Sequence, residues 1–139
     1  MPTFIYGKDA KLYRGPAGSL ANIEVPNVRN LTLTLEAGEA DVTTRANSGW
    51  RATAPTLREC TVEFEMLDDP TDAGFAAMRA AFLTGALIAL LPLNKVDGEG
   101  PDADFAITSF SRGEELEEAV TVNVTAKLAV FRQWKEATP

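Results

Sequence analysis

Three stretches of this chain alternate apolar and polar residues with a period of two, and this pattern constrains the fold more than any other feature. Residues 27–36 alternate leucine with threonine, residues 57–66 alternate valine, phenylalanine and methionine with threonine and glutamate, and residues 119–131 alternate mostly valine with polar residues. A period of two places successive side chains on opposite faces of a β-strand. The sequence therefore predicts a mainly β protein in which each strand has one core face and one face toward water or a neighbouring subunit.

A single helix is predicted between residues 69 and 85. Asp69 can cap its N-terminus, Pro70 suits the first helical position, and Gly85 suits the stop. Four large side chains fall on or beside one face of the helical wheel, and we expect them to be buried: Phe75, Met78, Phe82 and Leu83. The helix is predicted to be structural and to carry no catalytic group.

Shorter patterns predict the remaining elements. Residues 3–6 and 11–14 are β-prone runs around a turn that contains glycine, which indicates a hairpin. The apolar run 86–93 indicates a strand buried on both faces. Residues 105–111 are predicted to form a further strand.

Residues 94–104 form an acidic segment with two glycines and a proline. Its carboxylates, on Asp97, Glu99, Asp102 and Asp104, superficially resemble a calcium-binding loop. Asp102 stands where such a loop needs a glycine, so we interpret the segment as a solvated hairpin connection. No metal ligand is predicted.

A long polar segment at about residues 38–55 separates two of the predicted strands. It contains Arg45, Trp50 and Arg51 next to an Asn-Ser-Gly turn signal. Loops this long inside a compact domain are usually functional or disordered, and Trp and Arg are enriched among interface anchors. We interpret the segment as an arm that docks on another protein. The alternative is a long hairpin whose Trp50 folds back on its own core.

Two further groups of residues extend this interpretation. We expect the arm's arginines to pair with Glu114, Glu115 or Glu117 of a neighbouring chain. A C-terminal tail at about residues 131–139 carries Trp134, which we expect to be a second interface anchor outside the regular strands.

The composition excludes several classes of function. The 139 residues are 45% hydrophobic, which fits one domain over residues 1–139, and the net charge of −7 opposes tight binding of nucleic acid. No histidine and one cysteine rule out Ser-His-Asp and Cys-His catalysis and the common zinc sites. We therefore predict no catalytic residue, no cofactor and no metal. The apolar runs are too short to cross a membrane as a helix, and the N-terminus has no signal pattern, so we expect synthesis in a reducing cytosol.

Four stretches, in their order along the chain, resemble the major tail tube proteins of long-tailed phages and related prophages. They are MPTFIYGKDAKLYRG, LEAGEADVTTRANSGWRATAPTLRECTVEFEM, DDPTDAGFAAMRAAFLTG and ITSFSRGEELEEAVTVNVTAK, and they cover nearly the whole chain. The resemblance implies an antiparallel β-sandwich or barrel-like fold with one packed helix, similar to the type VI secretion tube protein. It also implies hexameric rings that stack into a hollow tail tube, with no enzymatic role.

That resemblance also implies partners and a location. The partners would be other copies of the chain and the tape measure, tail tip and tail terminator proteins, with DNA passing through without adhering. The chain would reside in the virion tail after synthesis in the host cytoplasm.

The surface that would line such a channel stays open at this stage. Glu63 and Glu65 share the outer face of the strand at 57–66 and would form a negative wall. The threonine faces of residues 27–36 and 119–131 are equally hydrophilic. A monomeric β-barrel carrier of a small ligand is the rival hypothesis, which requires a dry cavity with a few convergent polar groups. An enzyme that uses scattered carboxylates is the third.

Overall fold

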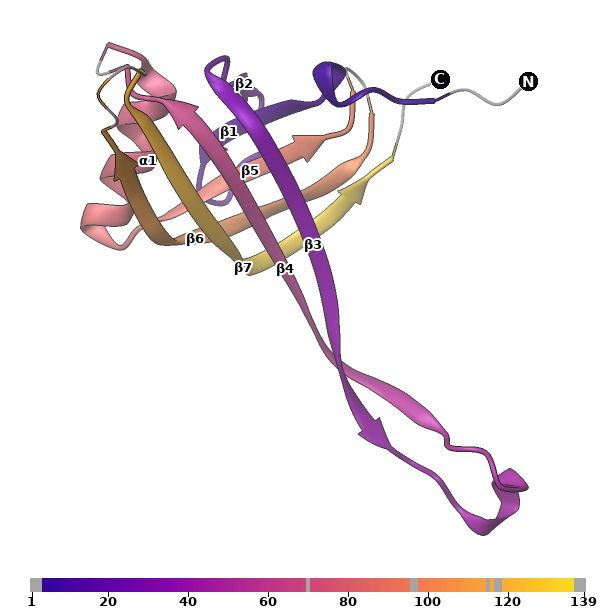
Figure 1. Cartoon of the computed structure of the whole chain (residues 1–139). Helices are drawn as coiled ribbons and strands as arrows, with labels where there is room; N and C mark the ends of the chain where they lie inside the picture. The colour runs from indigo at the N-terminus through magenta and orange to yellow at the C-terminus, as the bar shows by residue number, and fades with distance from the viewer. Residues whose placement is uncertain (1–3, 70, 96–97, 115, 117–118, 137–139) are drawn as a thin grey trace.

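A computed structural model describes residues 4–69, 71–95, 98–114, 116 and 119–136 of the chain (Figure 1). These residues form one antiparallel sheet of seven strands in the order β2-β1-β5-β6-β7-β4-β3. The strands are β1 (Lys11–Pro16), β2 (Ile23–Glu24), β3 (Val28–Asp41), β4 (Thr53–Leu67), β5 (Leu87–Leu93), β6 (Gly100–Gly113) and β7 (Thr121–Lys135). The helix is α1 (Ala73–Thr84), and two short 3-10 helices lie at Gly7–Asp9 and Arg45–Asn47. The predicted fold class, antiparallel β with one packed helix, is confirmed.

The sheet curls around a hydrophobic core, and α1 packs against β6 and β5 (Figure 1). The period-two pattern decides which side chains enter this core. Over residues 60–66 of β4 and 122–126 of β7 every second residue is buried, and these residues are Cys60, Val62, Phe64, Met66, Val122, Val124 and Ala126. Burial of such side chains contributes about 1.5–3 kcal/mol each as an upper estimate. The alternation therefore holds the sheet and the helix together as one unit.

The helix begins later than the sequence predicts. Asp72 is the N-terminal cap, because its carboxylate accepts a hydrogen bond from the Phe75 amide at 3.0 Å. Asp69 instead accepts hydrogen bonds from the amide and hydroxyl of Thr71, which closes a turn before the helix. Pro70, expected at the first helical position, lies outside the described residues. Gly85 ends the helix in the left-handed conformation with φ 74°, as expected.

Only part of the predicted apolar face of α1 is buried. Phe75 and Met78 are buried together with Ala81, but Leu83 is 72% exposed and Phe82 stays at the margin of the core. The Phe82 ring lies 6.1 Å from that of Phe110 on β6, which covers one side of it. The expectation that all four large side chains are buried is wrong for Phe82 and Leu83, because α1 lies at the end of the curled sheet and meets it along a narrow stripe.

The N-terminal hairpin predicted from residues 3–6 and 11–14 is also wrong for the part that the structure describes. Residues 4–6 are not in a strand, and Gly7–Asp9 forms a 3-10 helix. β1 pairs with β2 and β5 instead, and it continues through Gly15 and Pro16. A Cβ atom at Gly15 would lie 2.9 Å from the carbonyl oxygen of Leu20, so this glycine lets the chain cross closely over the strand.

The acidic segment at 94–104 is shorter than predicted. β6 already begins at Gly100, so Asp102 and Asp104 are buried strand residues and not parts of a solvated connection. Asp97 lies outside the described residues. Trp134 likewise belongs to β7, where it pairs with Pro101, and not to a tail beyond the strands. Both corrections have the same cause. β6 and β7 stay paired as far as Gly100 and Lys135, beyond the residues in which apolar and polar side chains alternate.

Gly100 gives a direct test of the β5–β6 packing. A Cβ atom at this position would overlap the backbone carbonyl oxygen of Pro92, so Gly100→Ala should lower the free energy of unfolding by about 1–3 kcal/mol. Gly7→Ala is the matched control, because no described atom lies within 4 Å of the added methyl group. Urea unfolding of the two variants checks this. Equal stability would show that β5 and β6 do not approach each other as closely as described.

Candidate interaction surfaces

β3 and β4 continue to pair beyond the body of the sheet and form a projecting two-stranded ribbon (Figure 1). In the body, β4 also pairs with β7, but along the ribbon β3 and β4 pair only with each other within the described part of the chain. The strands extend to Asp41 and resume at Thr53, so only residues 42–52 are a loop. Of the expected arm at about 38–55, both ends (38–41 and 53–55) are therefore β-strand, and the middle is the loop. These ends were missed as strand because a ribbon with two exposed faces carries no apolar alternation.

A β-bulge lies at the base of the ribbon, between Ala37 and Glu39. The extra residue of the bulge is on β4, where Thr56 and Leu57 lie opposite Gly38, and a Cβ atom on Gly38 would lie 2.5 Å from the Thr56 hydroxyl. Bulges bend a strand and increase its local twist. The bulge therefore sets the direction in which the ribbon leaves the body.

Short hydrogen bonds hold the loop at the tip of the ribbon. The Asp41 carboxylate accepts from the Thr43 amide at 2.9 Å, and the Thr43 hydroxyl accepts from the Ala52 amide at 2.8 Å. The Thr44 amide donates to the Asn47 side chain at 2.6 Å, which caps the short 3-10 helix. Hydrogen bonds from Thr43 also lower the pKa of Asp41. The tip thus has a defined conformation supported by its own side chains.

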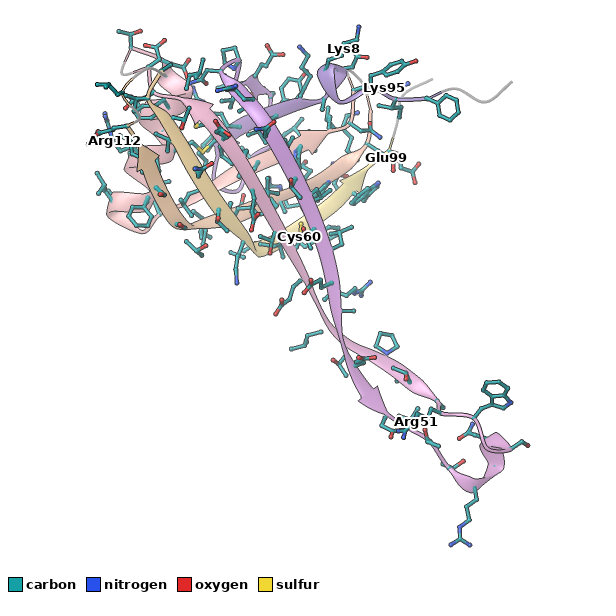
Figure 2. The ribbon with its side chains drawn as sticks, viewed as in Figure 1. Lys8, Arg51, Cys60, Lys95, Glu99 and Arg112 are labelled. Atoms are coloured by element: carbon teal, nitrogen blue, oxygen red, sulfur yellow. The ribbon has the colours of Figure 1, made fainter. Side chains whose placement is uncertain are left out.

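The tip presents Trp50 to solvent. Ser48 and Gly49 are left-handed, with φ of 53° and 86°, and they turn the chain just before this residue. Trp50 is 79% exposed, and Arg45 and Arg51 are exposed beside it. Figure 2 shows Arg51 on the ribbon, far from Cys60 at the body of the sheet. The alternative in which Trp50 folds back on its own core is therefore wrong.

The acidic residues expected to receive the arm's arginines are not gathered into a described site. Glu114 forms an ion pair with Arg112 of its own chain at 2.7 Å, with both side chains more than half exposed. Glu115 and Glu117 lie outside the described residues. The pairing of the arm with this turn stays a prediction.

The three polar stripes that the sequence left as alternatives lie on one face of the sheet. Glu63 pairs in register with Thr32 of β3 on one side and with Thr125 of β7 on the other. Glu65 pairs in the same way with Asn30 and Asn123. Residues directly opposite each other in antiparallel strands point to the same side. We call this surface, made by the outward residues of β3, β4 and β7, the polar face.

The two glutamates of the polar face differ in their surroundings. Glu65 accepts a hydrogen bond from Asn30 at 3.1 Å and forms an ion pair with Arg29 at 3.6 Å. Glu63 is exposed and forms no ion pair with another described residue. Its charge is therefore directed to the space in front of the sheet.

A buried ion cluster joins β6 to β7, and sequence reasoning missed it. The Arg132 guanidinium donates to Asp102 at 2.9 Å and also to Asp104. Asp104 accepts in addition from the Gly18 amide at 3.0 Å, which fixes the segment between β1 and β2 to the sheet. The signal available in the sequence was the period-two spacing of Asp102 and Asp104 just before a strand, since such a pair shares one face.

The cluster shifts the pKa values of Asp104 and Arg132. Burial by itself would raise the pKa of Asp104, but the hydrogen bond from Gly18 and the interactions with Arg132 lower it below its usual value. Burial by itself would lower the pKa of Arg132, but its bonds to both aspartates raise it. Asp104 and Arg132 are therefore both charged at neutral pH, where the cluster ties three segments together.

A groove of about 610 Å³ opens at the base of the ribbon. It lies between the start of the ribbon and the far ends of β6 and β7, and its lining is mostly apolar: Leu35, Ala37, Cys60, Pro101, Leu128, Phe131 and Trp134, with Glu36, Arg58 and Glu59. Leu35 was expected in the core on the pattern of its strand, but it is 56% exposed. The core ends at Leu33, and Leu35 lies beyond it in this groove.

Among the described residues, no group of three or more histidine, cysteine, aspartate or glutamate side chains is placed to hold a metal ion. None of the described helices is long and apolar enough to span a membrane.

The longest hairpin of this mainly β chain projects from the body and ends in an exposed tryptophan. This is the form of a subunit that binds other protein chains. The sequence matches the family model described as phage tail tube protein over residues 8–130. The chain belongs to this family and is a structural tail tube subunit, which favours the tube over the monomeric carrier. None of the curated proteins compared with it matches the sequence.

Several solved structures share this fold. The chain is similar to a subunit of the tail of an empty gene transfer agent particle, refined with C6 symmetry, at 18% identity and a TM-score of 0.78, covering 96% of this chain and 98% of that one. It is also similar to the SPP1 tail tube, at 16% identity and a TM-score of 0.75, covering 97% and 81%. A subunit of the anti-feeding prophage baseplate matches at 7% identity and a TM-score of 0.65, with both chains fully covered. These likenesses show a shared fold.

The ion cluster predicts how stability depends on pH. Because the pKa of Asp104 is lower in the folded state, its contribution is fully present above the unfolded-state pKa of about 3.9 and is lost as the pH falls through the folded-state pKa. Asp104→Asn should therefore lower the free energy of unfolding by about 1.5–3 kcal/mol at neutral pH, and the difference from wild type should shrink in acid. Denaturant unfolding over a range of pH measures it. The exposed Asp9→Asn is the control, and a pH-independent difference for Asp104→Asn would contradict the electrostatic origin.

Proposed function

We propose that copies of this tail tube protein assemble into stacked hexameric rings that enclose a channel for DNA. The observation that carries the proposal is the ribbon, which presents Trp50, Arg45 and Arg51 well away from the body of its own chain. Exposed aromatic and arginine side chains at a defined tip are typical of binding hot spots. The C6 symmetry of the gene transfer agent tail supports the ring number.

The subunit interface in this proposal includes Arg45, Trp50 and Arg51 at the tip and Trp134 on β7. Trp134 is 37% exposed at the groove, so a large apolar surface there is available to a neighbour. Removal of that surface from water would contribute to assembly at about 25 cal/mol per Å². No cofactor, metal or membrane is part of the proposal.

The channel lining is proposed to be the polar face, with Glu63 as its most exposed acidic group. Threonine and asparagine side chains flank Glu63 and Glu65 on both neighbouring strands. Repeated around a ring, these glutamates give a negative wall that repels phosphates, so DNA slides without adhering. Because the three candidate stripes share one face, all three strands would line the channel together.

The remaining partners follow from the role of a tail tube. In this proposal the tube contacts tape measure, tail tip and tail terminator proteins. The chain would act in the virion tail after synthesis in the host cytoplasm, as a single domain over residues 1–139.

Electron microscopy and light scattering of the concentrated protein test the proposed function. Rings or tubes with a central channel should appear as the concentration rises, or after tail tips are added as seeds. A species that stays monomeric at millimolar concentration with seeds present would overturn the proposal.

Trp50→Ala tests the role of the arm. Truncation of an interface tryptophan costs about 2 kcal/mol or more, roughly thirtyfold in a binding constant, and the loss recurs at every copy. The variant should therefore fail to form tubes, while its melting temperature stays close to wild type because Trp50 is exposed in the single chain. A large loss of monomer stability with tubes preserved would place Trp50 in a structural role of its own subunit.

The double variant Glu63→Lys/Glu65→Lys tests the polar face. Exposed ion pairs contribute little to stability, so each change should cost no more than about 1 kcal/mol, and tails should assemble. DNA ejection should slow, most of all at low salt, because phosphates would now bind the wall. Glu24→Lys/Glu99→Lys is the charge-matched control away from this face. Ejection rates that are equal in both variants would move the channel to another surface.

A further inference from the structure

The polar face is not uniformly acidic, because one lysine lies among its carboxylates. Lys127 of β7 is directly opposite Thr61 of β4, and Thr61 lies midway between Glu59 and Glu63 on its own strand. Residues two apart on a strand share a face, and so do residues directly opposite each other in antiparallel strands. Lys127 therefore belongs to the polar face, at a level between the two glutamates.

The surroundings of Lys127 leave its charge available. Its directly opposite neighbours are both uncharged, Thr61 on one side and Ala106 of β6 on the other. Glu59 and Glu63 are diagonal neighbours, and such neighbours lie about 7–8 Å apart. Lys127 is exposed, and it forms no ion pair with any residue that the structure describes. Its ammonium group is therefore free to meet an anion in front of the sheet.

Arg29, a second cation at the polar face, is already engaged. Its guanidinium forms an ion pair with one carboxylate oxygen of Glu65 at 3.6 Å, and Asn30 donates a hydrogen bond to the other oxygen at 3.1 Å. The positive charge of Arg29 is thus balanced in place, whereas that of Lys127 is not. The two cations differ in what they offer to an anion that passes in front of this face.

We propose that Lys127 is the point at which the phosphates of passing DNA contact the channel wall. A lysine ammonium group binds phosphate as a compact charge with three rotatable donors, so the contact needs no fixed orientation of the DNA. Phosphate contacts also carry no information on base sequence. This inference rests on the proposed function, because it takes the polar face as the lining of the channel.

The neighbouring carboxylates keep the contact weak. Glu59 and Glu63 repel a phosphate on either side of Lys127, and an exposed ion pair contributes only roughly 1.5–5-fold to a binding constant. Repeated in every subunit, such a contact slows the DNA without arresting it. The wall as a whole still repels DNA, so Glu63 prevents adhesion while Lys127 limits the rate of passage.

Ejection kinetics of particles that carry variant tail tubes test the contact. Lys127→Gln should speed DNA ejection at least about 1.5-fold at low salt, and Lys127→Arg should keep the wild-type rate because the charge remains. The effect of Lys127→Gln should disappear near 1 M salt, where the screening length falls to about 3 Å. Lys95→Gln is the control, since Lys95 is exposed in the turn between β5 and β6 (Figure 2), and it should change nothing.

Arg29→Gln separates a local contact from the average charge of the wall. It removes the same charge at the same face, but from a cation that Glu65 already binds. Ejection should therefore speed up less than it does in Lys127→Gln. Equal acceleration by the two variants would assign the effect to the average field and overturn the proposal.

A photo-crosslinking amino acid in place of Lys127 gives a readout that does not depend on rate. In particles arrested with DNA in the tail, this position should form covalent adducts with DNA, whereas the same amino acid in place of Lys95 should form none. Adducts with protein alone would assign Lys127 to a protein partner and overturn the contact. Failure of Lys127→Gln and Lys127→Arg to assemble tails would assign it to a subunit interface, with the same consequence.

The two sets of variants separate this contact from the proposed function. A wild-type ejection rate for Lys127→Gln, with slower ejection for Glu63→Lys/Glu65→Lys, would overturn the contact and leave the polar face as the channel lining. Wild-type rates in both would remove the polar face from the channel, and the contact with it.

Discussion

The pairing of β3 with β4 is the interaction on which the rest of this molecule depends. In the body it places Leu33 opposite Val62 and Leu31 opposite Phe64, so the same ladder of hydrogen bonds that joins the strands also fills the core. Beyond Cys60 the ladder continues without a core and becomes the ribbon. One hairpin therefore both contributes to the core and forms the projecting ribbon. A change that shifts its register by one residue would move the buried residues outward and turn the tip to the other side.

The rest of the sheet supports this hairpin with two different kinds of contact. β7 joins it through apolar side chains, and the far end of β7 is tied to β6 by Arg132 and the two aspartates. A buried pair of this kind is weak evidence for stability, since desolvation offsets much of the attraction. Its directional hydrogen bonds do fix the register of β6 against β7 at the margin of the groove. The groove therefore has a rigid wall on one side and the base of the ribbon on the other.

Local pattern predicted the parts of the fold that are decided locally. Val62, Phe64 and Met66 were assigned to the core because alternation determines the face of a strand. The same rule wrongly placed Leu35 in the core. Alternation tells which face of the strand a residue lies on, but not where along the strand the core ends. The exposure of Trp50 agrees with the interpretation of its segment as a projecting arm, which was drawn from its polar neighbours.

Features that depend on packing between distant segments were not predictable. Nothing near Asp104 in the sequence indicates that Gly18 and Arg132 lie beside it, because both come from other strands or loops. The choice between Asp69 and Asp72 as the helix cap is a similar case, since both are good caps and the position of α1 on the sheet decides. The three polar stripes share one face because β3, β4 and β7 are neighbours in the sheet. Local pattern does not predict this order, since it joins strands that are far apart in the chain.

The position of β3 at the edge of the sheet has a consequence for the free subunit. Along its outer side this long strand leaves backbone amides and carbonyls without strand partners in the described chain, and such an edge is a template for uncontrolled polymerisation. Acidic side chains recur along it at Glu36, Glu39 and Asp41. Two such edges that approached each other would bring carboxylates together, so mutual repulsion opposes uncontrolled edge-to-edge pairing of free subunits.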